Sequence, residues 1–538
     1  MKTALLQCNP VTGDIAGNIE RISQAVRRAG KVDLCVTPEL ALSGVAPGDF
    51  LSMNDFVEGC RKGLDILAAR FVSGPDLLVG APVVSVYEPS LLSNAAVYIH
   101  RGQWDVISRK VRPEASRDPD AEFFDRGVSL GIVNLAGWRL GIVLCEEDSN
   151  SSFWTVRGTG YMPLLDLISR GVDAIIHMRA TPYVIGKRAD HEAMLTHVAA
   201  RHHIHLLSVN IVGGNDGLVF AGQSLALDPT GTVYARGQAF AEDTLIVDMA
   251  TGTAPVATVG RSWQENVFGA LVLGTRDFIH KCGREKALVS ISGGIDSGLV
   301  LAIAVEALGA HNVSAVIMPS PETSPDAVAG ALQLAHTLGV KVSVIRIDGL
   351  MAEYERAVAQ TMKDFSLGVP DASRPQLQER IRGSIMTTLA NRAEGLVLST
   401  INKSEAAMGY CTLYGDTVGS LGVIADLTKS QVYAVAHWLN QDRKGLFPES
   451  MLKKSPSCKS SRQMQDLPYG ELDEVLDALL AAKPRRPLTD LHPRQSDVRQ
   501  RVFGMEFKRR QEPQPLYVSD KPFGRSWTVP LVGHFNLP

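Results

Sequence analysis

The stretch SISGGIDSGLV, residues 290–300, decides the fold of the second half of the chain. It joins an apolar, strand-like run to an apolar pattern that predicts a helix from Ser297 to Leu308. Gly293 and Gly294 lie between the two and allow the backbone to turn tightly. Strand, glycine turn and helix in this order are typical of the first unit of a doubly wound parallel sheet.

The same alternation continues downstream. Strand-like runs follow at 313–319 (VSAVIMP), 341–347 (KVSVIRI) and 395–400 (GLVLST). A helical pattern that extends through Ala335 separates the first two of these runs. We therefore expect a Rossmann-like, doubly wound parallel sheet in the second half, with a proline-rich, irregular tail from Gln511.

The first half of the chain contains many more strand-like runs, and helical patterns at 18–29 and 187–200 lie between some of them. The runs are TALLQC (3–8), VDLCVTP (32–38), DLLVGAPVVSVY (76–87), NAAVYIHR (94–101), RLGIVLCEE (139–147), DAIIHMRA (173–180), HLLSVNIV (205–212), SLALDP (224–229) and TLIVDM (244–249). This pattern predicts a layered α/β sandwich. The linker-like stretch TGTAPVATVGRSWQ, 251–264, separates two expected domains, residues 1–255 and 256–538.

Composition excludes several classes of protein. The 538 residues include 54 Lys and Arg against 57 Asp and Glu, a net charge of −3, which argues against nucleic acid or an anionic membrane as the main partner. No apolar run reaches the roughly 18 residues of a membrane span, and Asn9 and Pro10 interrupt the N-terminus too early for a signal peptide. We expect a cytoplasmic protein. Seven cysteines without a CxxC pair argue against a disulfide framework or a structural zinc site.

The glycine turn at 292–297 has the chemistry of a phosphate-binding loop. Backbone N–H groups, the hydroxyls of Ser292 and Ser297 and the positive end of the following helix can all face an anion. The loop lacks the lysine of a Walker motif and has Asp296, a residue suited to holding Mg²⁺ between phosphates. An ordinary glycine turn at a helix start is the alternative, which the two flanking serines make less favourable.

SGGIDS resembles the pyrophosphatase loop of enzymes that adenylate a carboxylate, and residues 380–416 and FKRRQ at 507–511 resemble NAD⁺ synthetase. The resemblance implies ATP, Mg²⁺ and deamido-NAD⁺ as ligands. The implied ATP-binding residues are Ser292, Gly293, Gly294, Ile295, Asp296, Ser297, Met318, Arg382 and Thr400. The implied metal ligands are Asp296 and Glu405, and the implied deamido-NAD⁺ residues are Lys403, Glu405 and Lys508. On the residues alone, the basic run 508–510 could equally be a solvated helix end.

An independent set of residues lies in the first half. Glu39 and Cys145 each come at the end of an apolar run, and Lys110 follows a third run. A cysteine that attacks an amide needs a base for its proton and a cation for the oxyanion, and glutamate and lysine can supply these. A buried cysteine at a strand end is more often inert packing.

The order Glu39, Lys110, Cys145 resembles the catalytic triad of the nitrilase superfamily, which implies an αββα sandwich. In glutamine-dependent NAD⁺ synthetases this amidase domain precedes the synthetase domain, and the stretches 181–188 and 208–231 support that likeness. The resemblance implies Glu146, Thr181 and Lys187 on the glutamine side.

The implied reaction has two halves. Glutamine is hydrolysed to ammonia, and ATP adenylates deamido-NAD⁺, which ammonia then converts to NAD⁺ with release of AMP and pyrophosphate. This activity is that of a C–N ligase with glutamine as nitrogen donor. The resemblance further implies a homo-oligomer and an internal passage for ammonia.

Several positions depart from the family pattern, among them Ser116, Arg179, Ile401 and the loop 456–466, where Cys458 replaces part of an expected acidic segment. Two other readings therefore stay open. One is a paralogous ligase that amidates a different carboxylic acid. The other is a non-catalytic homologue.

Overall fold

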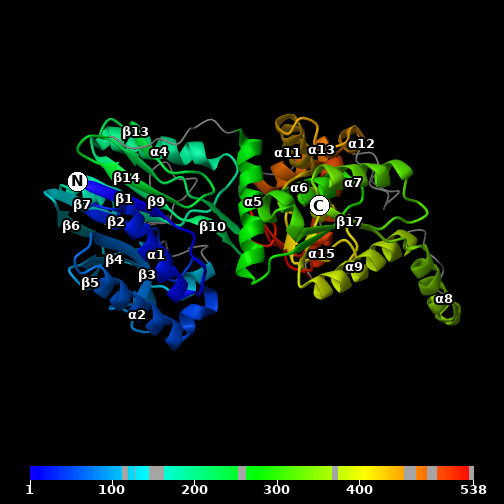
Figure 1. Ribbon diagram of the computed structural model, residues 1–538, viewed down its shortest axis with the longest axis horizontal. Coiled ribbons are helices and arrows are strands. Elements are labelled where there is room, and N and C mark those ends of the chain that lie inside the picture. The colour runs from blue at the N-terminus through cyan, green and yellow to red at the C-terminus, as the bar shows by residue number, and fades with distance from the viewer. Residues whose placement is uncertain are drawn as a thin grey trace. The chain divides into compact units, whose positions relative to one another are not determined.

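The computed structural model describes residues 1–111, 119–127, 129–144, 163–252, 262–365, 373–453, 468–481 and 493–531. The chain divides into two compact units, of which the first comprises Met1–Asn215 with Val219–Gly260. The second comprises Asp216–Leu218 with Arg261–Pro538. Each unit is built around its own sheets (Figure 1).

Unit 1 contains two six-stranded sheets and a small hairpin. The first sheet has the order β14-β1-β2-β3-β4-β5 and the second the order β13-β12-β9-β8-β7-β6. The strands are β1 (Lys2–Gln7), β2 (Leu34–Val36), β3 (Asp76–Val84), β4 (Leu92–His100), β5 (Gln103–Arg109), β6 (Gly131–Leu135), β7 (Trp138–Val143), β8 (Ala174–Arg179), β9 (His205–Asn210), β10 (Val212–Asn215), β11 (Leu218–Ala221), β12 (Leu225–Leu227), β13 (Val233–Arg236) and β14 (Asp243–Asp248). The helices are α1 (Ile15–Ala29), α2 (Asn54–Arg70), α3 (Pro163–Ser169) and α4 (Lys187–His202), with 3₁₀ turns at Gly48–Ser52 and Pro119–Glu122.

The two sheets of unit 1 face each other across one apolar core. Leu5 of β1 lies in this core beside Ile142 of β7, whereas its neighbours in sequence, Ala4 and Leu6, lie in a second core with Ile22 of α1. Successive strand residues point to opposite faces, so apolar residues on both faces require a cover on both sides. Helices α1 and α2 cover the first sheet, and α3 and α4 cover the second. The predicted αββα sandwich is confirmed.

Unit 2 contains one six-stranded sheet with the order β17-β16-β15-β18-β19-β20, in which all neighbours are parallel. Its strands are β15 (Ala287–Ser290), β16 (Val313–Ile317), β17 (Lys341–Val344), β18 (Leu396–Ser399), β19 (Leu421–Gly422) and β20 (Gln514–Pro515). Its helices are α5 (Trp263–Lys281), α6 (Ile295–Leu308), α7 (Pro325–Thr337), α8 (Asp348–Asp364), α9 (Ser373–Ala393), α10 (Lys403–Met408), α11 (Lys429–Asp442), α12 (Glu449–Lys453), α13 (Tyr469–Ala481), α14 (Pro493–Gly504) and α15 (Glu506–Arg509), with a 3₁₀ turn at Ala310–Asn312. The predicted doubly wound parallel sheet is confirmed.

Two local expectations for unit 2 need correction. Helix α6 begins at Ile295, two residues earlier than expected, because Gly294 is the N-cap and the helix starts directly after the glycine turn. The proline-rich tail is not wholly irregular, since β20 pairs with β19 at the sheet edge. Pro515 is tolerated there because an edge strand has one unpaired side. Among the described helices, none is long and apolar enough to cross a membrane.

Candidate active sites

In unit 1 the structure brings Glu39 and Lys110 into direct contact. Glu39 is buried in the turn after β2, and Lys110 directly follows β5. The Lys110 ammonium lies 2.8 Å from Oε1 of Glu39. The side-chain amide of Asn94, on β4, donates to the same oxygen at 2.7 Å. One carboxylate oxygen therefore accepts from both a cation and an amide.

Close backbone packing holds both residues in place. A Cβ on Gly80 of β3 would lie 2.2 Å from the carbonyl oxygen of Pro38, next to Glu39. A Cβ on Gly127 would lie 2.2 Å from the carbonyl oxygen of Lys110, and Gly127 has φ +61°. Only glycine permits these approaches, so the positions of Glu39 and Lys110 depend on Gly80 and Gly127.

Cys145 and Glu146 lie outside the described residues. Leu144, which precedes Cys145, is buried, and its carbonyl accepts a hydrogen bond from the backbone N–H of Val111 at 3.3 Å. The Lys110 N–H in turn donates to the carbonyl of Asn94 at 2.7 Å. Val111 follows Lys110 and Leu144 precedes Cys145, so this hydrogen bond brings together the backbone beside two of the three expected triad residues.

The two other described residues predicted for the glutamine side lie on the connection between β8 and α4. Thr181 exchanges two hydrogen bonds with the Asn210 side chain through its backbone, at 3.0 Å and 3.2 Å. Lys187 is the first residue of α4, after Gly186 with φ +82°. This connection is a separate element from the turns that hold Glu39 and Lys110.

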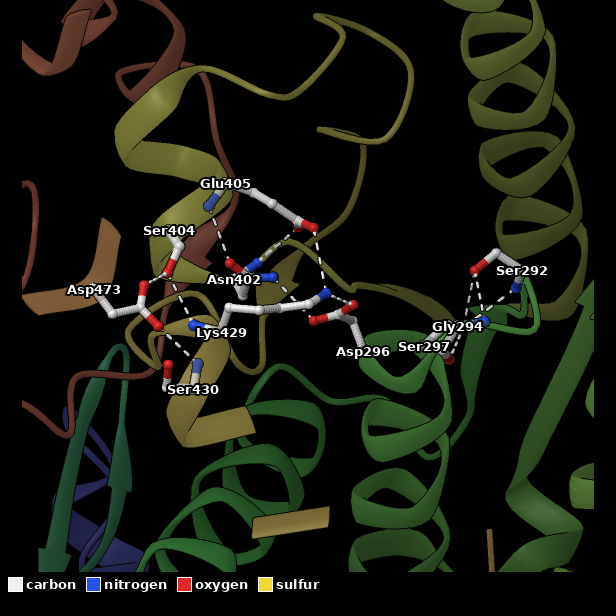
Figure 2. A network of polar contacts seen from close by, with 10 residues as sticks. All are labelled: Ser292, Gly294, Asp296, Ser297, Asn402, Ser404, Glu405, Lys429, Ser430 and Asp473. Atoms are coloured by element: carbon white, nitrogen blue, oxygen red, sulfur yellow. Dashed lines mark hydrogen bonds and ion pairs between the residues drawn. The ribbon is translucent and has the colours of Figure 1, made fainter. Parts of the chain in front are cut away.

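In unit 2 the predicted phosphate loop connects β15 to α6 (Figure 2). Gly293 has φ +78°, and a Cβ there would lie 2.3 Å from the carbonyl oxygen of Ala327. The N–H of Ser292 donates to the Ser297 hydroxyl at 3.2 Å, and the N–H of Gly294 donates to the Ser292 hydroxyl at 3.3 Å. The loop therefore has the backbone shape of an anion cradle, at the carboxyl end of a parallel strand.

Asp296, in the first turn of α6, contacts two residues that the sequence did not point to. Asn402 donates its side-chain amide to Oδ1 of Asp296 at 2.9 Å, and the Lys429 ammonium pairs with Oδ2. The same ammonium lies 3.7 Å from Oε1 of Glu405. Figure 2 shows Lys429 extending between the two carboxylates, which come from α6 and α10. The structure thus brings both expected metal ligands to one basic side chain.

The environment perturbs the titration of these groups. Burial and the nearby Asp296 charge raise the pKa of Glu405 to about 8. Burial acts to lower the pKa of Lys429, but Asp296 and Glu405 outweigh burial and hold it above its usual value. Two carboxylates around one ammonium form a cluster whose protonation is shared.

A sequence signal for Lys429 did exist. Thr428 and Gln431 form a capping box, so Lys429 occupies the first position of α11. A basic side chain is unfavourable at a helix N-terminus, which indicates that Lys429 has a partner elsewhere. Asn402 is likewise the N-cap of α10, in a capping box with Glu405.

Met318 and Thr400 follow β16 and β18, the two strands on either side of β15. Arg382, on α9, donates from Nε to the carbonyl oxygen of Met318 at 3.1 Å and pairs with Glu379 at 2.6 Å. These residues therefore lie near the carboxyl ends of adjacent parallel strands, where α/β sheets bind nucleotides.

The two lysines predicted for deamido-NAD⁺ make contacts within the protein. Lys403 is buried and donates to Asp426 at 2.9 Å and to the Ser519 hydroxyl at 2.8 Å. Lys508 donates to the carbonyl oxygens of Gly409 and Cys411 at 2.8 Å and 2.7 Å, where α10 ends. Their ammonium groups hold α10 at both ends, whereas Glu405 of the same helix faces Lys429.

Comparison with known proteins agrees with the division of the chain into two units. Residues 2–256 match the carbon-nitrogen hydrolase family, and residues 267–512 match the NAD synthase family. The chain is 37% identical to the glutamine-dependent NAD(+) synthetase of Synechocystis sp. and 32% identical to that of Thermotoga maritima, with at least 99% of each chain covered.

A solved structure is similar over the same length. It is the glutamine-dependent NAD⁺ synthetase of Acinetobacter baumannii in complex with ADP, with a TM-score of 0.77, 28% identity and coverage of 99% of this chain and 98% of that chain. The chain belongs to the family of glutamine-dependent NAD⁺ synthetases, C–N ligases that take the amide nitrogen from glutamine.

Proposed function

We propose that residues 1–255 hydrolyse glutamine with Cys145 as nucleophile, Glu39 as base and Lys110 as the cation that stabilises the oxyanion. The single observation that supports this is the geometry around Glu39. Lys110 and Asn94 both donate to Oε1. No described residue donates to Oε2, so this oxygen can take the thiol proton. Glu146, Thr181 and Lys187 bind glutamine in this proposal.

In the ligase half, residues 256–538, we propose that the cradle Ser292–Ser297 binds the phosphates of ATP and that Lys429 contacts them. Its ammonium, at the N-terminus of α11, can pair with phosphate oxygens as well as with Asp296. Met318, Arg382 and Thr400 bind the rest of the nucleotide. Met318 and Thr400 lie at the carboxyl ends of the strands next to β15, and Arg382 of α9 donates to the Met318 carbonyl oxygen.

The donor set at Asp296 and Glu405 fits Mg²⁺. Both are carboxylates, the hard oxygen ligands that Mg²⁺ takes in nucleotide sites. Both lie within 4 Å of one ammonium, so the position between them already favours positive charge. When bound, the ion would offset phosphate charge. Asp296 and Glu405 would hold it.

For the acceptor we propose deamido-NAD⁺, bound at α10. Glu405 faces the nucleotide site from the first turn of this helix, and Lys403 and Lys508 set its position. The loop 456–466 lies outside the described residues.

One assay set tests these assignments. Purified protein receives ATP, Mg²⁺ and deamido-NAD⁺ with either glutamine or ammonium, and AMP and NAD⁺ are measured. We expect NAD⁺ from both nitrogen sources. AMP formed only with another carboxylic acid would contradict the acceptor, and no AMP with any acid would contradict the ligase assignment.

We also propose a homo-oligomer that forms through α8. Of the 17 residues of α8, all described, only Met351 is buried. Leu350, Tyr354 and Val358 form an exposed apolar stripe at helical spacing. Figure 1 shows α8 extending away from the sheet of unit 2.

The charges of α8 suit a second copy of the chain. Its first half carries Asp348, Glu353 and Glu355, its middle carries Arg356, and its last turn carries Lys363 beside Asp364. An antiparallel pair of α8 helices would therefore bring Lys363 of each copy toward the acidic first half of the other. Tyr354→Glu should lower the mass measured by light scattering, and Gln360→Glu, off the stripe, should not. A wild-type monomer would contradict the proposal.

We also propose a cytoplasmic location, where ATP and glutamine are present.

A further inference from the structure

A buried carboxylate on α13 lies behind the nucleotide site. Asp473 accepts a hydrogen bond from the Ser404 hydroxyl at 2.5 Å and another from the backbone N–H of Ser430 at 2.7 Å. The Ser404 oxygen in turn accepts from the backbone N–H of Lys429 at 2.9 Å. Figure 2 shows this chain of contacts linking α13, α10 and α11.

These contacts determine the start of α11. The first N–H groups of a helix have no partner within the helix. Here Ser404 takes the N–H of Lys429, Asp473 takes that of Ser430, and the Thr428 hydroxyl takes that of Gln431 at 3.4 Å. A carboxylate at this position also interacts favourably with the helix dipole. The orientation of the first turn therefore depends on Asp473.

Helix α13 contacts the other end of Lys429 as well. The Lys429 ammonium lies 5.6 Å from the ring centre of Tyr469 on α13 and 5.9 Å from that of Tyr433. The backbone of Lys429 is thus held by Asp473 through Ser404, and the side chain of Lys429 lies against Tyr469. Helix α13 therefore influences the position of both the backbone and the ammonium group of Lys429.

We propose that Asp473 is a positioning residue for the ATP half-reaction. Through Ser404 and the first turn of α11, it sets where the Lys429 ammonium lies relative to Asp296. The inference rests on the proposed role of Lys429 in phosphate binding. Asp473 does not contact that ammonium in the described structure, so it acts through the helix.

The test uses full-length protein with ammonium as nitrogen donor, so that the amidase half does not limit the rate. Asp473→Asn keeps the side-chain shape but turns one acceptor into a donor, so either the Ser404 hydroxyl or the Ser430 N–H loses its acceptor. Ser404→Ala removes the same link from the other side. Each variant should lower kcat for AMP formation by about tenfold or more, with the KM for ammonium unchanged.

Three further variants separate positioning from general stability. Ser404→Thr keeps the hydroxyl and should retain most of the wild-type kcat. The double variant Asp473→Asn with Ser404→Ala should lose no more than either single variant, because both break one chain of contacts. Glu474→Gln, at an exposed glutamate of α13, should match the wild type.

Several outcomes would overturn the proposal. They are a wild-type kcat in Asp473→Asn, a loss in Ser404→Thr as large as in Ser404→Ala, additive losses in the double variant, and a loss that equals the unfolded fraction measured by circular dichroism. A wild-type protein that forms no AMP would instead contradict the proposed function itself.

Discussion

The two candidate sites place their charged groups on different kinds of element. In unit 1, Glu39 and Lys110 lie just beyond strands, in turns that glycines hold against neighbouring backbone. In unit 2, Asp296, Glu405 and Lys429 all lie in the first turns of helices. Helix N-termini attract anions, whereas the turn at Glu39 holds a carboxylate that is paired with Lys110. The difference matches an amide substrate in one unit and a polyphosphate in the other.

The sites also differ in charge balance. Glu39 has one cation, Lys110, and one amide donor. In unit 2 one ammonium lies beside two carboxylates, so its single positive charge is shared between them. Burial raises the pKa of Glu405 to about 8, so full ionisation of that site at neutral pH needs additional positive charge. The ion pair of the first site is balanced in charge, and the second site has the carboxylate donors that support the proposed Mg²⁺.

The largest expected effect is the loss of the glutamine-dependent activity while the ammonium-dependent activity stays unchanged. Cys145→Ala removes the proposed nucleophile, and glutamine-dependent NAD⁺ synthesis should fall by on the order of 10⁴-fold. The ammonium-dependent rate should stay at the wild-type value, as measured by NAD⁺ formation. Cys282→Ala, an exposed cysteine of unit 2, is the control. Equal loss with both nitrogen sources would show that the two sites are not independent.

Lys429→Met tests the helix-end site. Loss of the ammonium should lower the rate of AMP formation by on the order of 10²-fold, because the buried charge that we propose to stabilise phosphate is removed. Glutaminase activity, measured as glutamate release, should persist. Lys453→Met, an exposed lysine on α12, should change neither rate. A Lys429→Met variant with normal AMP formation would remove this lysine from the site.

Gly80→Ala tests the close packing of unit 1. The added Cβ would lie 2.2 Å from the carbonyl oxygen of Pro38. We expect it to lower the free energy of unfolding by about 3 kcal/mol, measured by denaturant titration, because backbone must shift around Glu39. Gly349→Ala on α8, where a Cβ meets open space, should not lower stability. Unchanged stability in Gly80→Ala would mean that the turn at Glu39 is not tightly constrained.

The smallest effect concerns pH. Burial raises the pKa of Glu512 to about 7. The folded state then binds more protons than the unfolded state between the usual glutamate pKa of about 4.3 and pH 7, so stability from this group falls as pH rises through that range and is constant above it.

Glu512→Gln should therefore gain Tm relative to the wild type as pH rises from 5 to 7.5. The exposed Glu474→Gln should show no such trend. A constant Tm difference across this range would mean that Glu512 titrates normally, and that the raised pKa values of unit 2 are confined to its nucleotide site.

The sequence by itself determined the features that depend on interactions between residues close together in the chain. The periods of apolar residues predicted a layered α/β sandwich and a parallel doubly wound sheet, and SGGIDS predicted an anion cradle because its glycines and serines act within one turn. The pairing of distant residues is different in kind. Lys429 and Asp296 are 133 positions apart, Lys110 and Glu39 are 71 apart, and Asp473 and Ser404 are 69 apart.

Only the tertiary structure decided which of these charges meet. Neither the period of apolar residues nor the spacing of the motifs predicts that α11 brings a lysine to Asp296, or that Lys403 and Lys508 hold the ends of α10. Sheet order and helix packing set those distances. An ion pair over such separations forms because the folded core has already brought its elements together.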